Sequence, residues 1–509
     1  MKKRALIATI ETTEKLSSLA CLFVKHGWEL IATSKAYDFL KSNSIAVINV
    51  ADFVGIEIDY GFPPTLHPKI EYALTEESAE NRIDLVFDTP YTLDKGFDIG
   101  GHTLLALSIK GDRIPVINFT NLEEIIIQIE LTGEIQKDLI NKLQRLALRN
   151  IVNRYIEIAG VVDAEAKYQQ FEKVRDLING ENPYQKATLF KDMSGCELYS
   201  LLTSDQIFGE IPCYTNLADA DYLLTTMNKA SNALFKYYGK VPYIAIAAKH
   251  GNPCGMALSW GSQIEAIEKA LWGNPVAIWG GEFICNFMIA KEEANLLQQS
   301  SKKKGKFGDG NWMLDVILSP EMDNEAVDIL GQRAKTKIFI NKNLYNLEYA
   351  FGHDEYKSIK GGCLIQEPNN YVLSIKDLNW HRMDYDRESV SSCVIAWSVA
   401  YSSFHGGNEV ALAKDDCLIS VGGGPSTVEA AEIAVWKAQK YGKSTRGAIF
   451  CTDAFFPYVD APQVLIDAGC KGGVVPAGGT RFTEVADLFY RNNVIVGFIP
   501  EIFRGFCRH

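Results

Sequence analysis

A lysine and a histidine stand side by side at the end of an apolar segment. Residues 243–248 indicate a strand, and a Gly-Asn-Pro turn sequence follows Lys249 and His250. Consecutive residues of a regular strand point to opposite faces, so these two side chains share a pocket only where the strand breaks, as the turn sequence favours. The carboxyl end of a strand is also where open α/β sheets bind ligands.

A lysine ammonium beside an imidazole disfavours the imidazolium, which makes His250 a candidate general base. The alternative is a solvated Lys249 with a structural turn contact for His250. The residues alone leave both interpretations open.

Two further segments follow apolar strands. Residues 421–427 carry three glycines before a helical pattern in which Ser426 and Glu429 are spaced as a capping box. Such a loop can hold a phosphate, although it lacks the spacing of a dinucleotide loop and the lysine of a Walker loop. Residues 452–458 bring three aromatic side chains to a strand end. Core packing is the ordinary reason for such a cluster, and stacking on a flat ligand is the alternative.

Metal chemistry is not expected. His250 and Cys254 resemble part of a deaminase zinc site, but there is no H-x-E sequence and no second cysteine at the required spacing. The eleven cysteines are odd in number and never spaced CxxC. This favours reduced thiols and a cytoplasmic location.

The charge balance argues against large anionic partners. With 51 Lys and Arg against 63 Asp and Glu, the formal net charge is −12, so neither nucleic acid nor a membrane surface is an expected partner. No apolar run reaches the roughly 18 residues of a membrane span. The apolar stretch near the N-terminus is too short for a signal peptide.

Alternating strand and helix patterns over residues 1–150 predict a small doubly wound α/β domain. A long helical pattern at 139–166 predicts a connector, and we place the boundary near residue 150. Residues 151–509 predict a larger α/β region with mixed sheets, in which 276–279 and 371–374 are among the expected strands. This region can accommodate two similar α/β lobes.

Several motifs, in order, resemble the bifunctional family that couples aminoimidazole carboxamide ribonucleotide (AICAR) formyltransferase to inosine monophosphate (IMP) cyclohydrolase. Residues 180–185 resemble its G-E-N-P-H-Q, and 216–220 its N-L-x-D-A. Residues 249–255 match K-H-x-N-P-C-G, 279–281 resemble F-G-G, and 453–457 match D-A-F-F-P. The resemblance extends along nearly the whole chain.

The resemblance implies a methylglyoxal-synthase-like first domain, a transformylase region of two cytidine-deaminase-like lobes, and a homodimer. It implies formyl transfer from 10-formyltetrahydrofolate to an amine, with His250 as base and Lys249 stabilising the formyl oxygen. The implied substrate-binding residues are Asn216, Trp279, Gly280, Asp315, Asn408 and His509. The implied folate-facing residues are Phe455, Pro457 and Tyr458.

The chain departs from the family at several phosphate-binding positions. Ile178 stands where the family has arginine or lysine, and Val428 stands where it has arginine. In the first domain, residues 33–36 replace the S-G-G-T loop, and Pro64 replaces the catalytic lysine. Tyr91, Asp98 and Lys110 remain at positions resembling cyclohydrolase residues.

The leading hypothesis is therefore a folate-dependent formyltransferase acting on AICAR or a related small molecule, with cyclohydrolase activity lost. One alternative is a specialised-metabolite enzyme that formylates a non-nucleotide amine. A second alternative is a pseudoenzyme that binds a ligand without catalysis.

Overall fold

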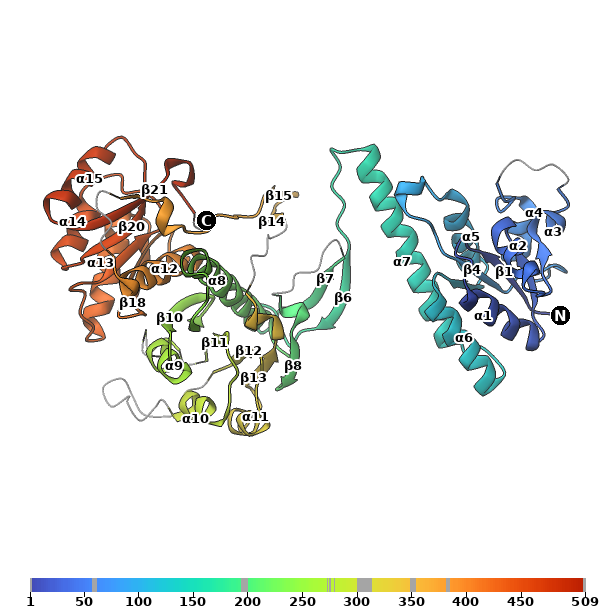
Figure 1. Ribbon diagram of the computed structural model, residues 1–509, viewed down its shortest axis with the longest axis horizontal. Helices are drawn as coiled ribbons and strands as arrows, with labels where there is room; N and C mark the ends of the chain where they lie inside the picture. The colour runs from blue at the N-terminus through green and yellow to red at the C-terminus, as the bar shows by residue number, and fades with distance from the viewer. Residues whose placement is uncertain are drawn as a thin grey trace. The chain divides into compact units, whose positions relative to one another are not determined.

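The computed structural model describes residues 2–56, 62–193, 200–271, 273, 276–278, 280–299, 314–347, 354–380 and 385–506. The chain divides into two compact units, Met1–Gln170 and Phe171–His509. Residue 150, the expected boundary, lies inside a helix of the first unit. Both units contain helices and strands, so the coarse prediction of an α/β protein is confirmed (Figure 1).

The first unit contains a five-stranded sheet in the order β3-β2-β1-β4-β5, with every neighbouring pair parallel. This is the strand order of a doubly wound sheet. The strands are β1 (Arg4–Ala8), β2 (Glu29–Ala32), β3 (Ile48–Asn49), β4 (Leu85–Asp88) and β5 (Ile114–Val116). The helices are α1 (Glu14–Lys25), α2 (Ser34–Ser42), α3 (Val50–Val54), α4 (Pro68–Thr75), α5 (Ile99–Lys110), α6 (Phe119–Thr132) and α7 (Lys137–Val162).

Helix α7 is the long helix expected from the sequence, and it packs through one stripe. Leu139, Leu143 and Ala147 are its buried residues, and their spacing of four places them on one helical face. Most of the remaining surface of the helix is exposed or only partly buried.

The second unit is built on a twelve-stranded mixed sheet in the order β16-β21-β20-β19-β17-β18-β10-β9-β11-β12-β13-β8. Its strands are β8 (Asp205–Phe208), β9 (Tyr243–Lys249), β10 (Asn252–Ser259), β11 (Glu282–Cys285), β12 (Val316–Ser319), β13 (Lys337–Ile340), β16 (Asn379–Trp380), β17 (Asn408–Lys414), β18 (Cys417–Gly424), β19 (Ile449–Thr452), β20 (Gly472–Pro476) and β21 (Ile495–Ile499). Two separate hairpins are β6 (Phe171–Asp176) with β7 (Thr188–Asp192) and β14 (Glu355–Ile359) with β15 (Gly362–Gln366).

The same element order occurs twice along this sheet. A long helix, an antiparallel hairpin and three further strands separated by helices run from α8 to β13, and again from α12 to β21. The helices of the first half are α8 (Tyr214–Tyr238), α9 (Gln263–Leu271), α10 (Lys291–Gln299) and α11 (Asn324–Leu330). Those of the second half are α12 (Arg387–Ser402), α13 (Thr427–Lys440), α14 (Asp460–Asp467) and α15 (Phe482–Arg491).

The two halves share one core. Strand residues on one face of the sheet, such as Ile244 and Ile246, pack with α8 and α12 in a single buried cluster. Their neighbours Ala245 and Ala247 face the other side and pack with α9, α10 and α11, as the alternation of strand side chains requires.

Two expected strands are wrong. Residues 276–278 form a turn, and residue 279 lies outside the described residues. Residues 371–374 pair with no described strand, because a lysine side chain and the buried core hold this segment instead. The Lys229 ammonium donates a hydrogen bond to the Tyr371 carbonyl at 3.1 Å. The Leu373 side chain is buried in the core that the two halves share. A short apolar run does not distinguish such a segment from a strand.

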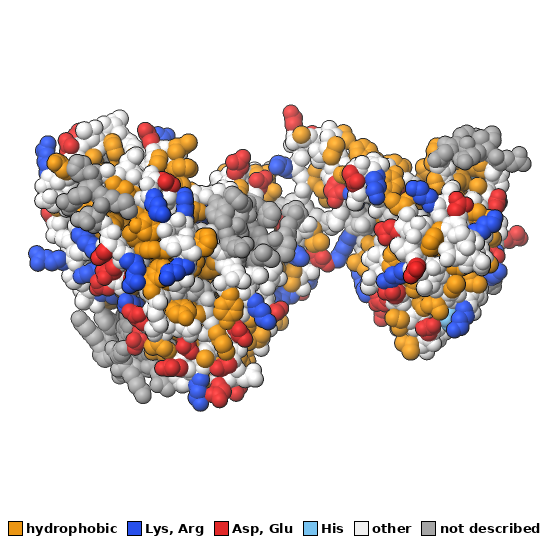
Figure 2. All heavy atoms as spheres, viewed as in Figure 1, with side chains coloured by type: hydrophobic (Ala, Val, Ile, Leu, Met, Phe, Trp, Pro, Cys, Tyr) orange, Lys and Arg blue, Asp and Glu red, His pale blue; other side chains and the backbone are white. Residues whose placement is uncertain are grey.

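No helix in the described parts of the chain is both long enough and apolar enough to cross a membrane. On the face shown in Figure 2, lysine and arginine side chains are interspersed with acidic ones across the described residues of each unit. That face therefore carries no continuous basic surface among the residues that are described.

Candidate functional site

Strand ends from both halves of the large sheet lie at the same edge. In the first half Ala248 pairs with Glu282, and in the second half Val410 pairs with Gly422 and with Thr452. Strands β10 and β18 run antiparallel where the halves meet, so the start of β10 lies beside the end of β18. The residues that begin or end these strands form the candidate site.

The turn between β9 and β10 breaks the strand at the expected place. Lys249 pairs with Asn252 across a two-residue turn, in which His250 has φ +53° and Gly251 has φ +69°. Positive φ at both central residues matches a type I′ hairpin turn. A Cβ atom on Gly251 would lie 2.2 Å from Tyr222 Cδ2, so only glycine fits there. Lys249 and His250 line the same pocket, of about 270 Å³.

Lys249 is held at the first-half side of the site. Its ammonium donates a hydrogen bond to the Gly280 carbonyl. Gly280 has φ +63°, and a Cβ there would lie 3.0 Å from Lys249 Nζ and 3.7 Å from Asp315 Oδ2. Asp315 in turn pairs with Arg333, with 3.2 Å between Oδ1 and Nη1. The glycine thus leaves room for the lysine and the carboxylate to approach each other.

Two buried acids near Lys249 were missed by sequence reasoning. Glu282 is 2% exposed, and its pKa is raised well above the usual value by burial and then by the charge of Asp219, with Lys249 opposing. The pKa of Asp219 is raised by burial, while the charges of His250 and Lys249 oppose this. Both shifts disfavour the charged forms of these two acids beside Lys249. No local spacing links Glu282 to Lys249 in the sequence.

A second histidine faces the pocket from the other half. His405 Nδ1 donates to Glu409 Oε2 at 2.8 Å, and the His405 backbone N–H donates to Glu409 Oε1. Glu409 is buried, whereas the His405 side chain is 25% exposed. The partly buried Lys437 donates to the Val421 carbonyl at 2.9 Å and also lines the pocket with His405. Burial lowers the pKa of Lys437, with Glu409 opposing.

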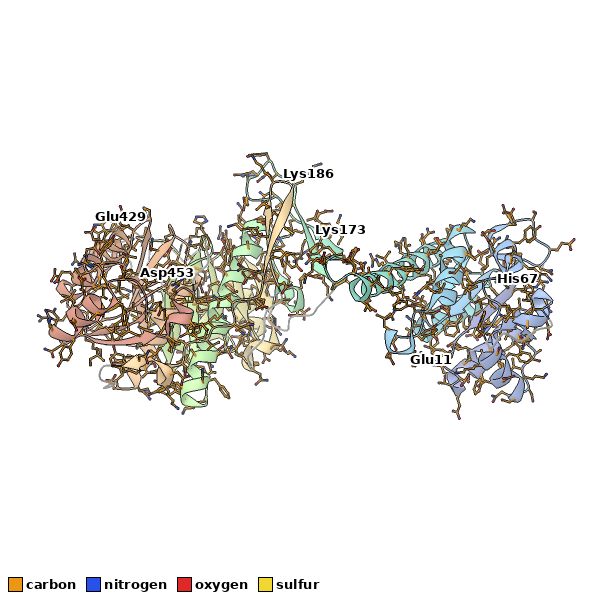
Figure 3. The ribbon with its side chains drawn as sticks, turned by 90° about the horizontal axis from the view of Figure 1, so that it is seen from above. Glu11, His67, Lys173, Lys186, Glu429 and Asp453 are labelled. Carbon is orange, nitrogen blue, oxygen red and sulfur yellow. The ribbon has the colours of Figure 1, made fainter. Side chains whose placement is uncertain are left out.

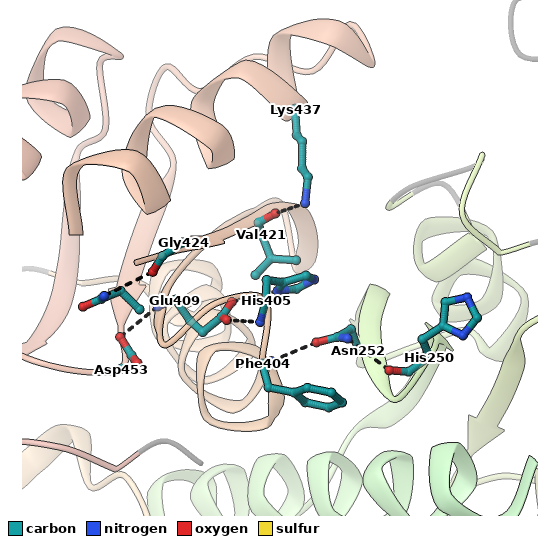
Figure 4. Close-up of polar contacts among 10 residues, drawn as sticks. His250, Asn252, Phe404, His405, Glu409, Val421, Gly424, Lys437 and Asp453 are labelled. Atoms are coloured by element: carbon teal, nitrogen blue, oxygen red, sulfur yellow. Dashed lines mark hydrogen bonds and ion pairs between the residues drawn. The ribbon is translucent and has the colours of Figure 1, made fainter. Parts of the chain in front are cut away.

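Asn252 connects the two halves at this pocket. Its Oδ1 accepts a hydrogen bond from the Phe404 backbone N–H at 2.9 Å, and its Nδ2 donates to the His250 carbonyl at 3.0 Å. Figure 4 shows Asn252 between the segment that carries His250 and the segment that carries His405. One amide side chain therefore fixes the spacing of the two histidine-bearing segments.

Replacing Asn252 with alanine is expected to lower the free energy of unfolding by about 1–2 kcal/mol, because two hydrogen bonds are lost. Since the two histidine-bearing segments also lose their link, the turnover number should fall with little change in KM. Urea unfolding and steady-state kinetics measure the two effects. Asn252→Asp is the matched variant, because it keeps the acceptor for Phe404 and replaces the donor to the His250 carbonyl with a carboxylate oxygen that repels it. Unchanged turnover in Asn252→Ala would contradict a positioning role.

The other predicted substrate residues lie in different local environments. Asn216 is buried in the first turn of α8 and accepts from the Cys213 backbone N–H at 3.3 Å. Asn408 donates to the Gly424 carbonyl at 3.1 Å across the β17–β18 ladder. Trp279 and His509 lie outside the described residues.

The segment after β19 divides its aromatic side chains between core and surface. Phe456 is buried, while Phe455 packs over Gly479, where a Cβ would lie 2.9 Å from its ring. Pro457 is partly buried, and Tyr458 is 56% exposed, with Arg481 5.6 Å from its ring centre. Phe455, Pro457 and Tyr458 are thus accessible to different degrees beside Asp453, which Figure 3 labels.

The two positions at which the sequence lacks the family's cations lie in different environments. Ile178 is exposed, with its backbone N–H bound to the Pro212 carbonyl, and Val428 packs against a core cluster. Lys437 lies nine residues after Val428 on α13. It brings positive charge to the pocket that sequence reasoning did not anticipate. Within the described residues, no group of three His, Cys, Asp or Glu side chains could hold a metal ion.

In the first unit, Tyr91 and Asp98 line a cavity at the end of the sheet, together with Pro64. Lys110 pairs with Glu71 at 3.1 Å in an exposed contact and is not among the residues that line this cavity. The three surviving cyclohydrolase-like residues are therefore not gathered in one site among the described residues.

Comparison with known proteins agrees with the motif resemblance. The sequence profile of the "AICARFT/IMPCHase bienzyme" family matches residues 113–437. The chain belongs to this family. The PurH bifunctional purine biosynthesis proteins of Bacillus thuringiensis (strain Al Hakam) and Bacillus cereus (strain ATCC 10987 / NRS 248) are each 27% identical to it over 532 aligned positions. Each alignment covers 96% of this chain and 97% of the relative.

The AICARFT/IMPCHase family is a family of enzymes, and the resemblance derived from the motifs is confirmed. The crystal structure of ForH aligns with 32% of this chain and 98% of its own, at 22% identity. Its TM-score of 0.28 is too low to establish a shared fold. Family membership rests on the profile and on the near full-length PurH relatives.

Proposed function

We propose that this protein transfers a formyl group from 10-formyltetrahydrofolate to the amine of a small molecule, AICAR or a relative of it. The observation that carries the proposal is the turn that brings Lys249 and His250 to one pocket between the two halves. Family membership supports the choice of reaction.

In the proposed reaction the acceptor nitrogen attacks the formyl carbon, and His250 removes a proton from that nitrogen as the C–N bond forms. The bond between the formyl carbon and N10 of the folate then breaks, and N10 takes a proton as tetrahydrofolate leaves. His250 is exposed at its turn, so an entering ligand can reach it. Lys249 stabilises the negative charge that develops on the formyl oxygen in this proposal.

We propose Asn216, Gly280, Asp315 and Asn408, together with Trp279 and His509, as residues of the acceptor side. Phe455, Pro457 and Tyr458 are proposed to contact the folate. Lys437 supplies a cation at the pocket that Ile178 and Val428 do not. An acceptor with an acidic group therefore remains compatible with the site, although the family's own phosphate ligands are missing.

The acceptor is tested with the purified chain, 10-formyltetrahydrofolate and a matched set of amines. The set contains AICAR, its phosphate-free ribonucleoside, and simple aromatic amines without a sugar. We expect release of tetrahydrofolate with AICAR or the ribonucleoside. Turnover confined to the sugar-free amines would favour the specialised-metabolite alternative. Tetrahydrofolate release that is equal in wild type and His250→Ala would favour a pseudoenzyme.

We also propose that the cyclohydrolase activity is lost, because Pro64 cannot supply the ammonium of the family's lysine. The formylated product should accumulate without forming IMP in the same assay, which chromatography of the products measures. IMP formation at a rate comparable to formyl transfer would contradict this proposal.

The finer description of the architecture is also a proposal. It comprises a methylglyoxal-synthase-like domain over residues 1–150 and two cytidine-deaminase-like lobes over 151–509. The repeated element order of the second unit supports the two lobes. Exposed apolar side chains on α7 and on the β6–β7 hairpin, among them Val152, Tyr155 and Phe171, support a homodimer, which sedimentation equilibrium tests. The free state of all described cysteines fits the proposed cytoplasmic location.

A further inference from the structure

The candidate pocket of the second unit extends into a gap between the two half-sheets. Ala257 and Cys417 pair across the boundary between β10 and β18. In a continuous antiparallel ladder Cys254 would face Ser420, because each lies three residues further along its strand. Instead both residues line the pocket. The two strands therefore separate here, and the pocket occupies the gap.

Lys437 reaches this gap because α13 lies close to β18. A Cβ on Gly422 would lie 2.3 Å from both the Ala430 carbonyl oxygen and the Ala434 nitrogen, so the glycine permits the close approach. Lys437 follows Ala434 by three residues, which places both on the same helical face. Its ammonium donates to the Val421 carbonyl at 2.9 Å, as Figure 4 shows. The side chain is thus held over the sheet, partly buried.

The Lys437 ammonium is partly removed from water. Burial lowers the pKa of Lys437, with Glu409 opposing. Both carboxylate oxygens of Glu409, however, accept hydrogen bonds from His405. An ammonium has three N–H donors, and the Val421 carbonyl takes one of them. An anion in the gap would therefore stabilise the charge of Lys437 through a further charge-assisted hydrogen bond.

The wall of the pocket favours an anion. It carries Lys249, Lys437 and two histidines, and neither aspartate nor glutamate is among its described residues. Ser420 is 7% exposed, and its hydroxyl has no hydrogen-bond partner within the described part of the chain. Buried hydroxyl groups are normally paired. An unpaired one next to the carbonyl that Lys437 binds indicates that a polar partner is missing from the pocket.

The gap suits a carboxylate better than a phosphate. The pocket volume of about 270 Å³ lies below the roughly 300–1,000 Å³ of sites that enclose a whole small molecule. Lys437 lies in the last turn of α13, where the negative end of the helix dipole opposes a dianion more than a single charge. Near the other end of α13 stands Glu429, which Figure 3 labels, and its carboxylate accepts from the Ser426 hydroxyl at 3.0 Å. Neither end of this helix therefore favours a phosphate.

We propose that Lys437 binds a carboxylate of the formyl acceptor in this gap, while the amine of the acceptor lies at His250. The inference rests on the formyl transfer proposed above, and it narrows the relatives of AICAR to amines that carry a carboxylate. Lys437 then determines which acceptor binds and takes no part in bond formation.

The first test measures binding to the full chain by ligand-observed NMR and needs no turnover. The probes are ortho-, meta- and para-aminobenzoate, each paired with the aminobenzamide of the same substitution pattern, so that a carboxylate is compared with an uncharged group of similar size. We expect at least one aminobenzoate to bind with a Kd below about 1 mM and at least about tenfold more tightly than its amide. No preference for the carboxylate in any pair overturns the proposal.

Variants of Lys437 test the residue itself. Lys437→Met keeps an unbranched side chain without the charge, so the preference for the carboxylate should fall at least about tenfold, as expected for one hydrogen bond to a charged group. Lys437→Arg keeps the charge and should keep most of the preference.

Lys440→Met is the matched control for these variants. Lys440 lies on the same helix with its ammonium 4.6 Å from the centre of the Trp436 ring, and it is not among the described residues that line the pocket. Its replacement should leave the binding of all probes unchanged. A carboxylate preference that survives in Lys437→Met, or that is lost in Lys440→Met, contradicts the assignment to Lys437.

Turnover separates this inference from the proposed formyl transfer. With 10-formyltetrahydrofolate, Lys437→Met should raise the KM of the preferred aminobenzoate at least about tenfold, while kcat changes by less than about twofold. A carboxylate preference that depends on Lys437, without release of tetrahydrofolate, would contradict formyl transfer and leave the carboxylate site standing. Release of tetrahydrofolate with equal KM for acid and amide would do the reverse. A rise in the KM of the folate alone would place its own carboxylates at Lys437 and overturn the assignment to the acceptor.

Discussion

Replacing His250 with asparagine is expected to lower the turnover number for formyl transfer by about 10²–10⁴-fold, the usual contribution of a general base. Asparagine is the informative choice because His250 has φ +53°, a conformation that asparagine tolerates better than most residues. The variant therefore removes the imidazole while keeping the turn. His250→Ala should lose at least as much activity, since alanine also strains the turn.

The control for this experiment is His26→Ala, because His26 lies in the first unit and its nearest acidic partner is the exposed Glu130, 3.9 Å away. Its turnover should equal that of wild type. The measurement is the release of tetrahydrofolate under saturating acceptor. A His250→Asn variant that keeps more than about one tenth of wild-type turnover would show that His250 is not the base, since that loss is below the range expected for one.

Replacing His405 with alanine is expected to cost about 2–3 kcal/mol of unfolding free energy, because it leaves the Glu409 carboxylate buried without its imidazole partner. The cost stays below that of a fully buried pair because the His405 side chain is 25% exposed. The Asp453 carboxylate accepts the Glu409 backbone N–H at 2.9 Å, so the disturbance also reaches the start of the segment proposed to contact the folate.

The pairwise energy is isolated by a double-mutant cycle. Glu409→Gln alone and the double variant His405→Ala with Glu409→Gln complete the cycle, and the double variant should be more stable than His405→Ala. The exposed pair of Arg481 and Glu484 is the control, and Arg481→Ala should leave unfolding almost unchanged. Chemical denaturation gives all of these values. Equal losses in His405→Ala and Arg481→Ala would contradict a structural role for the His405–Glu409 pair.

The parts of the site that depend on neighbouring residues could be predicted from the sequence. The break after Lys249 follows from the glycine and proline that come next, and the cap of α13 follows from the spacing of Ser426 and Glu429. The Ser426 hydroxyl accepts the Glu429 backbone N–H at 3.3 Å. Both features need only local geometry.

Contacts between distant segments could not be predicted in this way. Asn252 and Phe404 are 152 residues apart, and nothing in either segment indicates that they meet at the boundary between two half-sheets. The His405–Glu409 pair has a local signal, a histidine and a glutamate four residues apart around two glycines. Its burial, however, depends on the strand pairing of β17. The sequence predicts only that Glu282 lies in a strand. Its burial beside Lys249 depends on strand pairing with Ala248, which the sequence does not indicate.

The boundary between β10 and β18 has a mechanical consequence. Only Ala257 and Cys417 pair across it in the described sheet, whereas β9 and β10 share a ladder of seven pairs. One further backbone hydrogen bond, from Leu258 N–H to the Asp416 carbonyl at 2.9 Å, joins the half-sheets here, and α8 and α12 pack together in the core that the halves share. The distance between the His250 and His405 segments therefore depends on helix packing on the opposite face of the sheet as well as on the Asn252 hydrogen bonds. Altered packing of the buried Trp397 would change the distance between the two histidine-bearing segments, although Trp397 does not line the pocket.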